Sequence, residues 1–462
     1  MWLDRFLAAC LAPLAVWILL SGLDDVFINL ACVFSWRRRF QWPAVSDLDS
    51  SPERRIAILL PLWREDGVIE QMLDRNLAAI RYGDYEIFAG VYPNDNPTIC
   101  AVYQVARRDR RVHVAVCSQD GPTSKADCLN HAWDRMKSFE AAHGFRFEIV
   151  VMHDAEDLVH PDELRLISCL SPRYEMVQIP VLPLPTGPGE LTHGVYCDEF
   201  AEYQSKDIPV RQLLGGFLPS NGVGTGFDRA SLDRLAEQRG GGVFEPDCLT
   251  EDYETGYCLH AMGCRQTFVP IRMDAEGPVA TREYFPRRFQ AAVRQRSRWV
   301  AGIALQGWER HGWRAPWRQA YWFWRDRKGL AGNLLTPAAN LVFAYGLASY
   351  LVAAVSARPW YLGSQVPASL AVVYAATASL SVVQAAARVR SSARVYGWRF
   401  ASGVPVRMLW ANALNCAATV SALMQFIAAR TRRRTMEWRK TEHVYPAQQV
   451  PGYTPVSFSE PV

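Results

Sequence analysis

The chain has 462 residues, with 50 Lys and Arg against 46 Asp and Glu and a formal net charge of +4. This excess is too small to indicate a nucleic-acid partner, which normally requires a strongly basic surface. The 11 cysteines show no metal-binding spacing, a usage typical of reduced thiols in a cytosolic compartment.

Residues 6–35 form a mostly apolar stretch that is interrupted by Asp24 and Asp25. No small-residue cleavage site follows, so we expect residues 1–36 to be a retained membrane anchor. Because ionised groups are costly in lipid, the acidic pair is expected at the membrane boundary or against another helix. The arginines at 37–39 are typical of a cytoplasmic flank, although a solvated charge run is the simpler alternative.

Residues 46–312 are predicted to form one soluble α/β domain with a mainly parallel sheet. Short apolar runs alternate with helical patterns, as in βαβ units. The expected helices include residues 66–80 and 125–137, and the expected strands are residues 55–62, 85–92, 112–117, 147–152 and 176–181. In such sheets ligands bind beyond the carboxyl ends of the strands, where Asp95 and Asp154 both lie.

Residues 330–430 are predicted to be a membrane region. Two segments, residues 334–355 and 366–387, each hold roughly twenty uncharged, mostly apolar residues, which is enough to span a bilayer. We expect them to form a helical hairpin. Residues 431–462 are expected to be a cytoplasmic tail.

A third apolar segment, residues 404–429, has a different pattern. Asn412, Asn415 and Thr419 give it one polar stripe, and arginines lie on both sides of it. A spanning helix would place one basic cluster outside, against the positive-inside bias. We therefore expect an interfacial or hairpin-packed helix.

Acidic residues mark the end of the fourth predicted strand. Asp154 and Glu156 are alternate residues, so their carboxylates can converge while Ala155 faces away. Such a pair suits a divalent cation, Mg²⁺ or Mn²⁺. Taken alone, an acid-rich strand end is more often a helix cap, a role open to Asp162, and Asp95 by itself is best explained by an Asx-type turn.

Two further sites hold charged residues at predicted helix starts. Lys125 opens a helix whose N-terminal amides attract an anion, although an ordinary surface lysine is the alternative. Thr250 is expected to cap a helix over residues 252–262, with Glu251 and Asp252 in its first turn. The helix dipole alone accounts for acids there, whereas the functional interpretation makes Asp252 a general base.

A basic amphipathic stretch over residues 282–310 carries the last candidate group. Gln295, Arg298 and Trp299 share one helical face by their i, i+3 and i+4 spacing. Arginine binds phosphate bidentately and tryptophan stacks on sugars. A membrane-surface helix with arginines toward the headgroups is the compatible alternative.

These motifs in this order resemble the processive family 2 glycosyltransferases, which have the GT-A fold and include cellulose, chitin and hyaluronan synthases. The resemblance covers residues 54–312 and rests on Pro61…Glu65, Asp95, Asp154-Ala155-Glu156, Thr250-Glu251-Asp252 and Gln295-x-x-Arg298-Trp299. Within this group, residues 153–157 and 438–443 look most similar to the family of the inner-membrane subunit of the phage N4 receptor system (adsorption protein B). That family is implicated in making a surface polysaccharide.

The resemblance implies a role for each motif. Glu65, Asp95 and Lys125 would contact the nucleotide-sugar, with Asp95 at the uridine. Asp154 and Glu156 would bind the metal and diphosphate, and Asp252, beside Glu251, would be the catalytic base. The acceptor and diphosphate contacts would come from Gln295, Arg298, Trp299, Asn221 and Gly222, and a gating loop from Lys440 and Thr441.

The implied activity is inverting transfer from a UDP-sugar to a growing polysaccharide at a bacterial inner membrane. The multi-pass chain would have a cytoplasmic catalytic domain, contacts with membrane lipids, an export or outer-membrane partner, and no nucleic-acid partner. Transfer of one sugar to a lipid carrier, and a non-catalytic receptor or assembly subunit, are the alternatives. Glu156 departs from the usual DxD motif, and the sequence ends soon after Lys440, so we expect a short form without the C-terminal regulatory domain.

Overall fold

The structure is a computed structural model. A seven-stranded sheet in the order β3-β2-β1-β4-β7-β5-β8 positions its other elements. Its strands are β1 (Ile56–Pro61), β2 (Tyr85–Val91), β3 (Val112–Val116), β4 (Ile149–Met152), β5 (Met176–Gln178), β7 (Thr225–Asp228) and β8 (Gln266–Phe268). Only β7 runs antiparallel to its neighbours β4 and β5. The structure describes residues 2–34, 41–187, 189–274, 277–434 and 436.

Both faces of this sheet are apolar, as expected for strands buried on two sides. On β1, Ile58 and Leu60 belong to one core cluster and Ala57 and Leu59 to the other. The first cluster is covered by α3 (Ile69–Ala79), α4 (Asn96–Ala106) and α6 (Glu163–Leu170). The second is covered by α5 (Lys125–His143), α9 (Arg229–Gln238) and α10 (Glu251–Ala261). The predicted α/β class with a mainly parallel sheet is confirmed.

The expectation for residues 176–181 was wrong in one respect. Pro180 has no N–H to donate, so the strand is interrupted there. β5 ends at Gln178, and Val181–Pro183 forms a separate strand, β6, which pairs with β11 (Thr281–Glu283) in a small sheet. A further small sheet pairs β9 (Met273–Asp274) with β10 (Gly277–Pro278).

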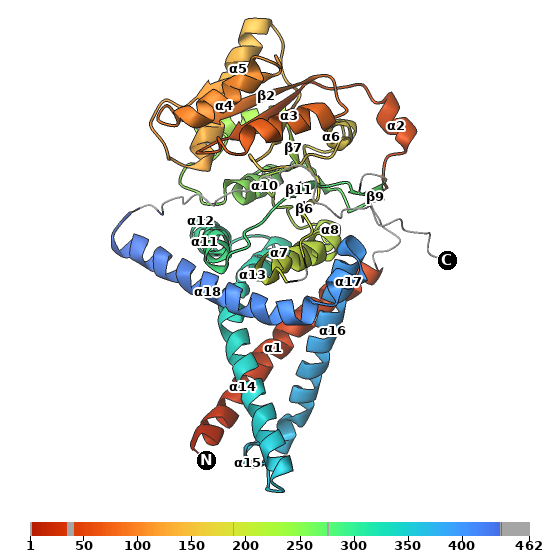
Figure 1. Ribbon diagram of the computed structural model, residues 1–462, viewed down its shortest axis with the longest axis vertical. Helices are drawn as coiled ribbons and strands as arrows, with labels where there is room; N and C mark the ends of the chain where they lie inside the picture. Colours follow the sequence, from red (N-terminus) through yellow and green to blue (C-terminus); the bar gives the residue numbers. More distant parts are fainter. Residues whose placement is uncertain (1, 35–40, 188, 275–276, 435, 437–462) are drawn as a thin grey trace.

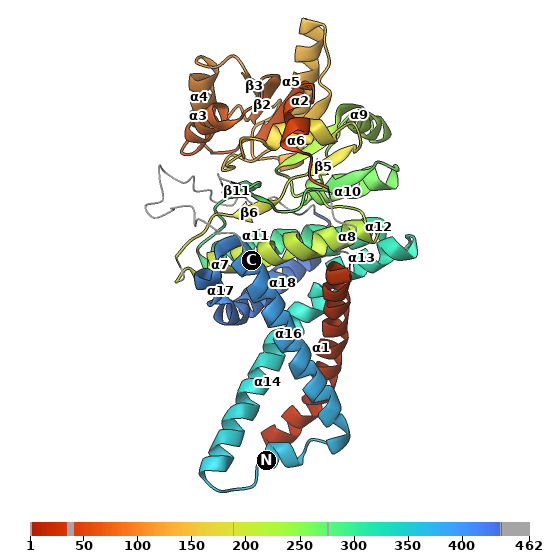
Figure 2. The ribbon, with the colours of Figure 1, turned by 90° about the vertical axis from the view of Figure 1, so that its right-hand side faces the viewer.

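A layer of helices lies between the sheet and three other long apolar helices (Figures 1 and 2). The layer contains α7 (Leu191–Glu202), α8 (Ile208–Leu213), α11 (Phe289–Trp299), α12 (Gly307–His311), α13 (Trp317–Arg327) and α18 (Val404–Thr431). We call this layer the neck. Two π-helical segments, Tyr203–Asp207 and Val300–Gln306, continue α7 and α11 within it.

The polar stripe of α18 faces other parts of the protein. Asn415 donates to Glu199 of α7 and accepts from Arg296 of α11, and Thr419 accepts from Asn333 of α14. In Figure 1 the helix runs across the long axis, beneath α11 and α7. Its length and composition also suit a membrane span, so its interfacial placement stays a prediction.

Below the neck, α1 (Trp2–Phe34), α14 (Gly329–Val355) and α16 (Ala371–Tyr396) form a stalk (Figure 1). Among the described residues, four helices, these three and α18, are long and apolar enough to cross a membrane. The helix α1 packs against both arms of the expected hairpin, α14 and α16. Gly22 of α1 permits this close approach, since a Cβ there would lie 3.1 Å from the Leu380 side chain.

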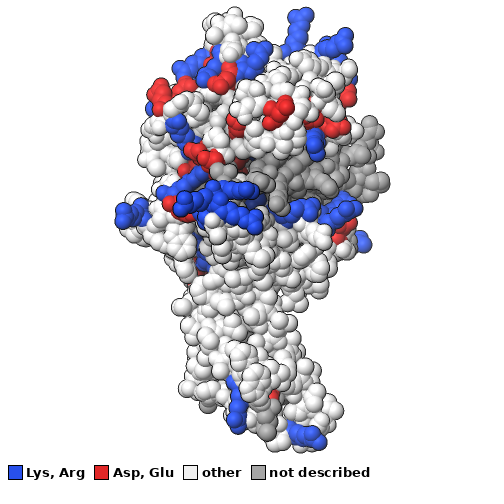
Figure 3. Space-filling model, turned by 90° about the vertical axis from the view of Figure 1, so that its left-hand side faces the viewer, with Lys and Arg blue, Asp and Glu red and all other residues white. Residues whose placement is uncertain are grey.

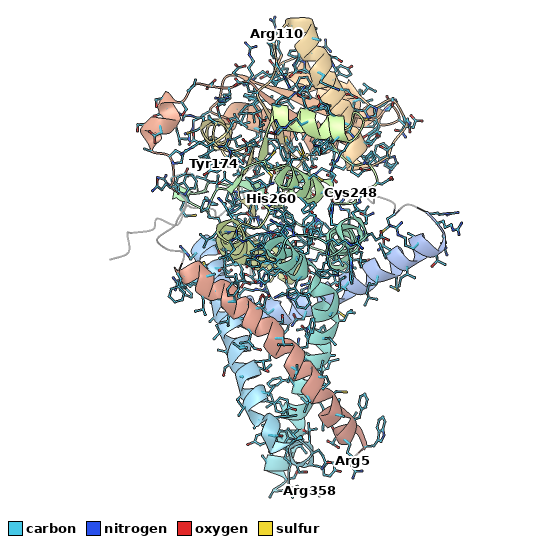
Figure 4. All side chains as sticks on the ribbon, turned by 180° about the vertical axis from the view of Figure 1, so that it is seen from behind. Arg5, Arg110, Tyr174, Cys248, His260 and Arg358 are labelled. Atoms are coloured by element: carbon cyan, nitrogen blue, oxygen red, sulfur yellow. The ribbon has the colours of Figure 1, made fainter. Side chains whose placement is uncertain are left out.

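The distribution of charge distinguishes the stalk from the neck. On the face in Figure 3, the stalk is almost entirely white and has charged side chains at its tip. A dense band of Lys and Arg lies above the stalk at mid-height, separated from it by a mostly white zone. Figure 4 places Arg5 and Arg358 at the stalk tip, while Arg110 marks the opposite end of the molecule.

The acidic pair of α1 faces another helix, as expected from the sequence. Asp24 accepts from the Tyr321 hydroxyl (2.7 Å), from Arg325 (2.5 Å) and from Lys328 (2.7 Å). Arg325 also donates to Asp207 of the π-helical segment at 2.8 Å. These ion pairs fasten the anchor helix to the neck. The arginines at 37–39 lie outside the described residues.

The double substitution Asp24→Asn with Asp25→Asn is expected to destabilise the protein. It leaves the mostly buried Arg325 with less compensating charge, and breaking such a pair costs about 3–5 kcal/mol when burial is complete. We expect a lower Tm for the detergent-solubilised chain. Asp4→Asn, at the opposite end of α1 where Asp4 meets the Tyr345 hydroxyl, is the control. An equal Tm loss in both variants would contradict this account.

Candidate active site

A cavity of about 500 Å³ lies between the carboxyl edge of the sheet and the neck. Figure 4 labels Cys248 and His260, which lie close to the two ends of α10. They mark the level of the cavity, midway between the stalk tip and Arg110. The cavity brings together predicted residues from five separate segments of the chain: Lys125, Asp154, Glu156, Asn221, Asp252, Gln295, Arg298 and Trp299.

Lys125 lies beside the acidic end of β4. Ser124 caps α5 by accepting from the Asp127 N–H (3.2 Å), which places Lys125 in the first turn. Its Nζ lies 2.6 Å from Asp154 Oδ1 and 2.8 Å from Oδ2. Burial alone would lower the pKa of Lys125, but Asp154, Glu251 and Asp252 outweigh it and raise that pKa. The lysine therefore carries a full positive charge into the cavity.

Asp154 and Glu156 are arranged as the alternation predicts. Both line the cavity, whereas Ala155 packs into the core beneath the sheet. Two carboxylates that share one cavity give the hard oxygen donors that Mg²⁺ and Mn²⁺ prefer. The residues present therefore fit a divalent cation.

A second acidic group lies elsewhere. In the part of the chain that the structure describes, His160, Asp162 and Asp274 bring ligand atoms within 4.8 Å of one another. None of these lines the cavity. Asp162 is paired with Arg81 (2.5 Å) and Arg165 (3.3 Å). Its carboxylate makes no capping bond to α6, so the suggested cap was wrong.

Asp252 reaches the cavity from the first turn of α10. Its Oδ1 accepts from the Tyr253 N–H at 2.8 Å. Glu251 is buried behind it and is not among the residues that line the cavity. Burial raises the pKa of Asp252, and burial together with Asp252 raises the pKa of Glu251 to about 7. Thr250 occupies the N-cap position without the expected capping bond, since its side chain packs against Gly302.

The loop of residues 220–224 lies directly against Asp252. Gly222 has φ +76°, and a Cβ there would lie 2.8 Å from Asp252 Oδ2. The loop is held by Gln178 at the end of β5, whose Oε1 accepts from the Asn221 N–H at 2.9 Å. Asn221 lines the cavity, so this predicted acceptor wall stands beside the predicted base.

Gln295, Arg298 and Trp299 present one face of α11 to the cavity, as their spacing predicts. The intervening Arg296 points the other way and is buried. It donates to Glu199 and to Asn415, both at 2.7 Å, and so ties α11 to α7 and α18.

The remaining predicted residues lie outside this cavity. Glu65 lines a smaller adjoining space of about 60 Å³, with Trp63 and Tyr92, which shares Lys125, Asp154 and Arg298 with the main cavity. Asp95 lines neither space and heads α4, where its carboxylate accepts from the Arg64 N–H at 2.6 Å. Arg64 lies outside the turn of residues 93–97, so this bond is not that of an Asx-type turn, and the role of Asp95 stays a prediction. Lys440 and Thr441 lie outside the described residues.

Sequence reasoning missed the lower end of the cavity. It is formed by polar and charged residues of the neck and stalk: Asp25, Glu199, Glu202, Lys206, Asp207, Arg325, Asp326, Gln384 and Arg388. Glu202 accepts from Lys206 and Arg388, both at 2.6 Å. Glu202 and Arg388 are 186 residues apart in sequence. The acids of α7 resemble an ordinary solvated helix face in the sequence.

Comparison with known proteins identifies the class. Residues 52–302 match the model of the glycosyltransferase like family 2, so the chain belongs to this family. The match covers the sheet, its helices and the cavity residues of α11.

Two curated relatives are similar over most of this chain. It is 36% identical, over 94% of its length, to bacteriophage adsorption protein B of Escherichia coli K12 and to bacteriophage N4 adsorption protein B of Escherichia coli O157:H7. The resemblance expected from residues 153–157 and 438–443 is thereby confirmed. The chain spans 62% of the length of each relative.

Solved structures of glycosyltransferases are more distant. The mannosyltransferase of Pyrobaculum calidifontis in complex with GDP-Man and Mn²⁺ is 19% identical, with a TM-score of 0.48, over 89% of this chain and 99% of that one. Glucosyl-3-phosphoglycerate synthase of Mycobacterium tuberculosis, with Mn²⁺ and UDP, is 16% identical, with a TM-score of 0.30, over 50% and 76%.

Gly222→Ala is expected to abolish activity. A left-handed φ costs an L-residue roughly 1–2 kcal/mol, and the new Cβ would also displace the Asp252 carboxylate. Gly240→Ala is the matched control, because Gly240 has φ +78° but nothing within 4 Å of its Cβ position. We expect similar Tm losses in the two variants but loss of UDP release only in Gly222→Ala. Equal activity in both would contradict the placement of Asp252.

Proposed function

We propose that this glycosyltransferase moves a sugar from a UDP-sugar to a growing surface polysaccharide, with inversion at the anomeric carbon. The observation that carries the proposal is the single cavity shared by the Asp252 carboxylate and the Lys125–Asp154 pair. A proton acceptor and a diphosphate-binding group are the two requirements of such a transfer.

The donor end of the site is assigned to Lys125, Asp154, Glu156 and Arg298. Asp154 and Glu156 would hold Mg²⁺ or Mn²⁺, which supplies positive charge to the departing diphosphate. Lys125, with the N-terminal amides of α5, and Arg298 bind the diphosphate oxygens and orient the nucleotide. The adjoining small space beside Glu65, Trp63 and Tyr92 is assigned to the nucleoside.

Asp252 acts as the general base. Its carboxylate accepts the proton of the acceptor hydroxyl while that oxygen forms a bond to the anomeric carbon. The bond between this carbon and the diphosphate oxygen breaks on the opposite side, which inverts the configuration. Burial raises the pKa of Asp252, which strengthens it as a base. Trp299 and Asn221 hold the acceptor sugar beside it.

The charge distribution supports a bacterial inner-membrane protein with a cytoplasmic catalytic part. The basic band lies on the side of the apolar stalk that leads to the sheet, and basic residues favour the cytoplasmic side (Figure 3). This orientation places the cavity on the side where nucleotide-sugars are made. The acceptor and any export or outer-membrane partner would meet the enzyme at the membrane surface.

Transfer of one sugar to a lipid carrier is the second candidate. It is favoured by the reach of the cavity to Asp25 of α1 and to Gln384 and Arg388 of α16, beside the lipid-facing helices. Product length separates the two: a ladder on a gel indicates a polymerase, and one discrete glycolipid indicates a single transfer. A non-catalytic assembly subunit would release no UDP from any UDP-sugar.

Asp252→Asn is expected to abolish transfer while UDP still binds. Loss of a general base lowers kcat by about 10²–10⁴-fold, and the amide keeps the shape of the site. UDP release from a labelled UDP-sugar, together with UDP affinity, measures both effects in purified membranes. Asp134→Asn, an exposed acid that pairs with Lys137, is the control. Turnover by Asp252→Asn at the wild-type rate would contradict the proposal.

On the acid side of its pH profile (the acid limb), kcat is expected to fall at a pH above the ordinary pKa of an aspartate. The base must be ionised, so activity is present above the raised pKa of Asp252 and is lost as pH falls through it. Lys125 favours the ionised form, so Lys125→Met should move the limb to higher pH at saturating donor. An unchanged limb in Lys125→Met would show that Asp252 is not the titrating group.

A further inference from the structure

A histidine is buried between two carboxylates directly behind the Asp154–Glu156 turn. His153 Nδ1 lies 2.8 Å from Asp157 Oδ2, and Nε2 lies 3.0 Å from Glu163 Oε1. The side chains of all three are at most 1% exposed. None of them lines the cavity, so none contacts the substrate there.

This arrangement is costly if its role is only to stabilise the fold. Removing charged groups from water costs several kcal/mol per ion, and apolar residues of similar volume commonly fill such sites without loss of stability. Each imidazole nitrogen faces a carboxylate oxygen, at 2.8 Å and 3.0 Å, and these two contacts fix the orientation of the ring.

The network reaches the two loops that form the site. Asp157 Oδ2 also accepts from the Asp154 backbone N–H at 3.0 Å, which closes the turn that carries Asp154 and Glu156. On the other side, Glu163 Oε2 accepts from the Thr281 hydroxyl of β11 at 2.8 Å. Gly224, at the end of the acceptor-side loop, packs so closely on Thr281 that a Cβ would collide with its hydroxyl.

We infer that His153, Asp157 and Glu163 are positioning residues that hold the Asp154 and Glu156 carboxylates in the geometry of a divalent-cation site. The inference rests on the proposed function, in which these two carboxylates bind the cation. Hydrogen bonds behind the ligands of a metal set their orientation, and their loss typically lowers metal affinity 10–100-fold. Thr281 extends the same support to the acceptor-side loop.

The test is Mn²⁺ binding in the presence of UDP, measured by electron paramagnetic resonance on the full chain in detergent. In Glu163→Gln, which keeps the volume but removes the charge facing His153, the half-saturating Mn²⁺ concentration should rise about 10-fold. The matched control is Glu140→Gln. Glu140 is also a buried glutamate, bonded to the Phe147 N–H (2.8 Å) and to Arg229 (3.1 Å), but it supports α5 and β4 away from the cavity.

A general packing role predicts a different pattern. Both variants would then have a lower Tm. The half-saturating Mn²⁺ concentration would change in neither variant, or would change equally in both. Either result would overturn the inference. If Glu163→Gln fails to fold, Thr281→Val removes only the hydroxyl bonded to Glu163 and should still weaken Mn²⁺ binding; unchanged binding would overturn the inference. Failure of the wild-type chain to bind Mn²⁺ with UDP would overturn the proposed cation site itself, and this inference with it.

Discussion

The whole site depends on gathering several carboxylates in one buried cavity. Asp154, Glu156 and Asp252 line this cavity with Lys125 and Arg298, and Glu251 lies just behind. Like charges at short range repel one another strongly when water is excluded, and this repulsion disfavours the ionised state. Lys125 opposes this effect through its contact with Asp154. An enzyme that must attract a diphosphate and a cation, and keep a base ionised, needs such a balance.

The neck ties together the helices that surround this cavity. Arg296 joins α11 to α7 and α18, and Arg325 joins α13 to the anchor helix and to Asp207. The residues between these ties, including Trp299, face the cavity. The floor of the cavity consists of stalk and neck residues, so the packing of the stalk helices helps to shape it.

The sequence predicts the sheet and most of the site, because the relevant signals are local. Alternation at the end of β4 places Asp154 and Glu156 together, and helical spacing places Gln295 with Trp299. The antiparallel β7 escaped prediction because Thr225–Asp228 is four residues long, contains glycine and gains its stability from β4 and β5. The lower end of the cavity was not predicted for a related reason: Glu202 and Arg388 meet only through the packing of α7 on α16.

The stereochemistry of the product tests the account most directly. The donor should be a UDP-sugar that gives metal-dependent UDP release and whose sugar is α-linked to the diphosphate. The new linkage is then analysed by nuclear magnetic resonance. A base at Asp252 that activates the acceptor for attack opposite the departing diphosphate predicts a β-linked product. An α-linked product would require a second displacement or front-side attack, and would contradict the role of Asp252 on which the proposed mechanism rests.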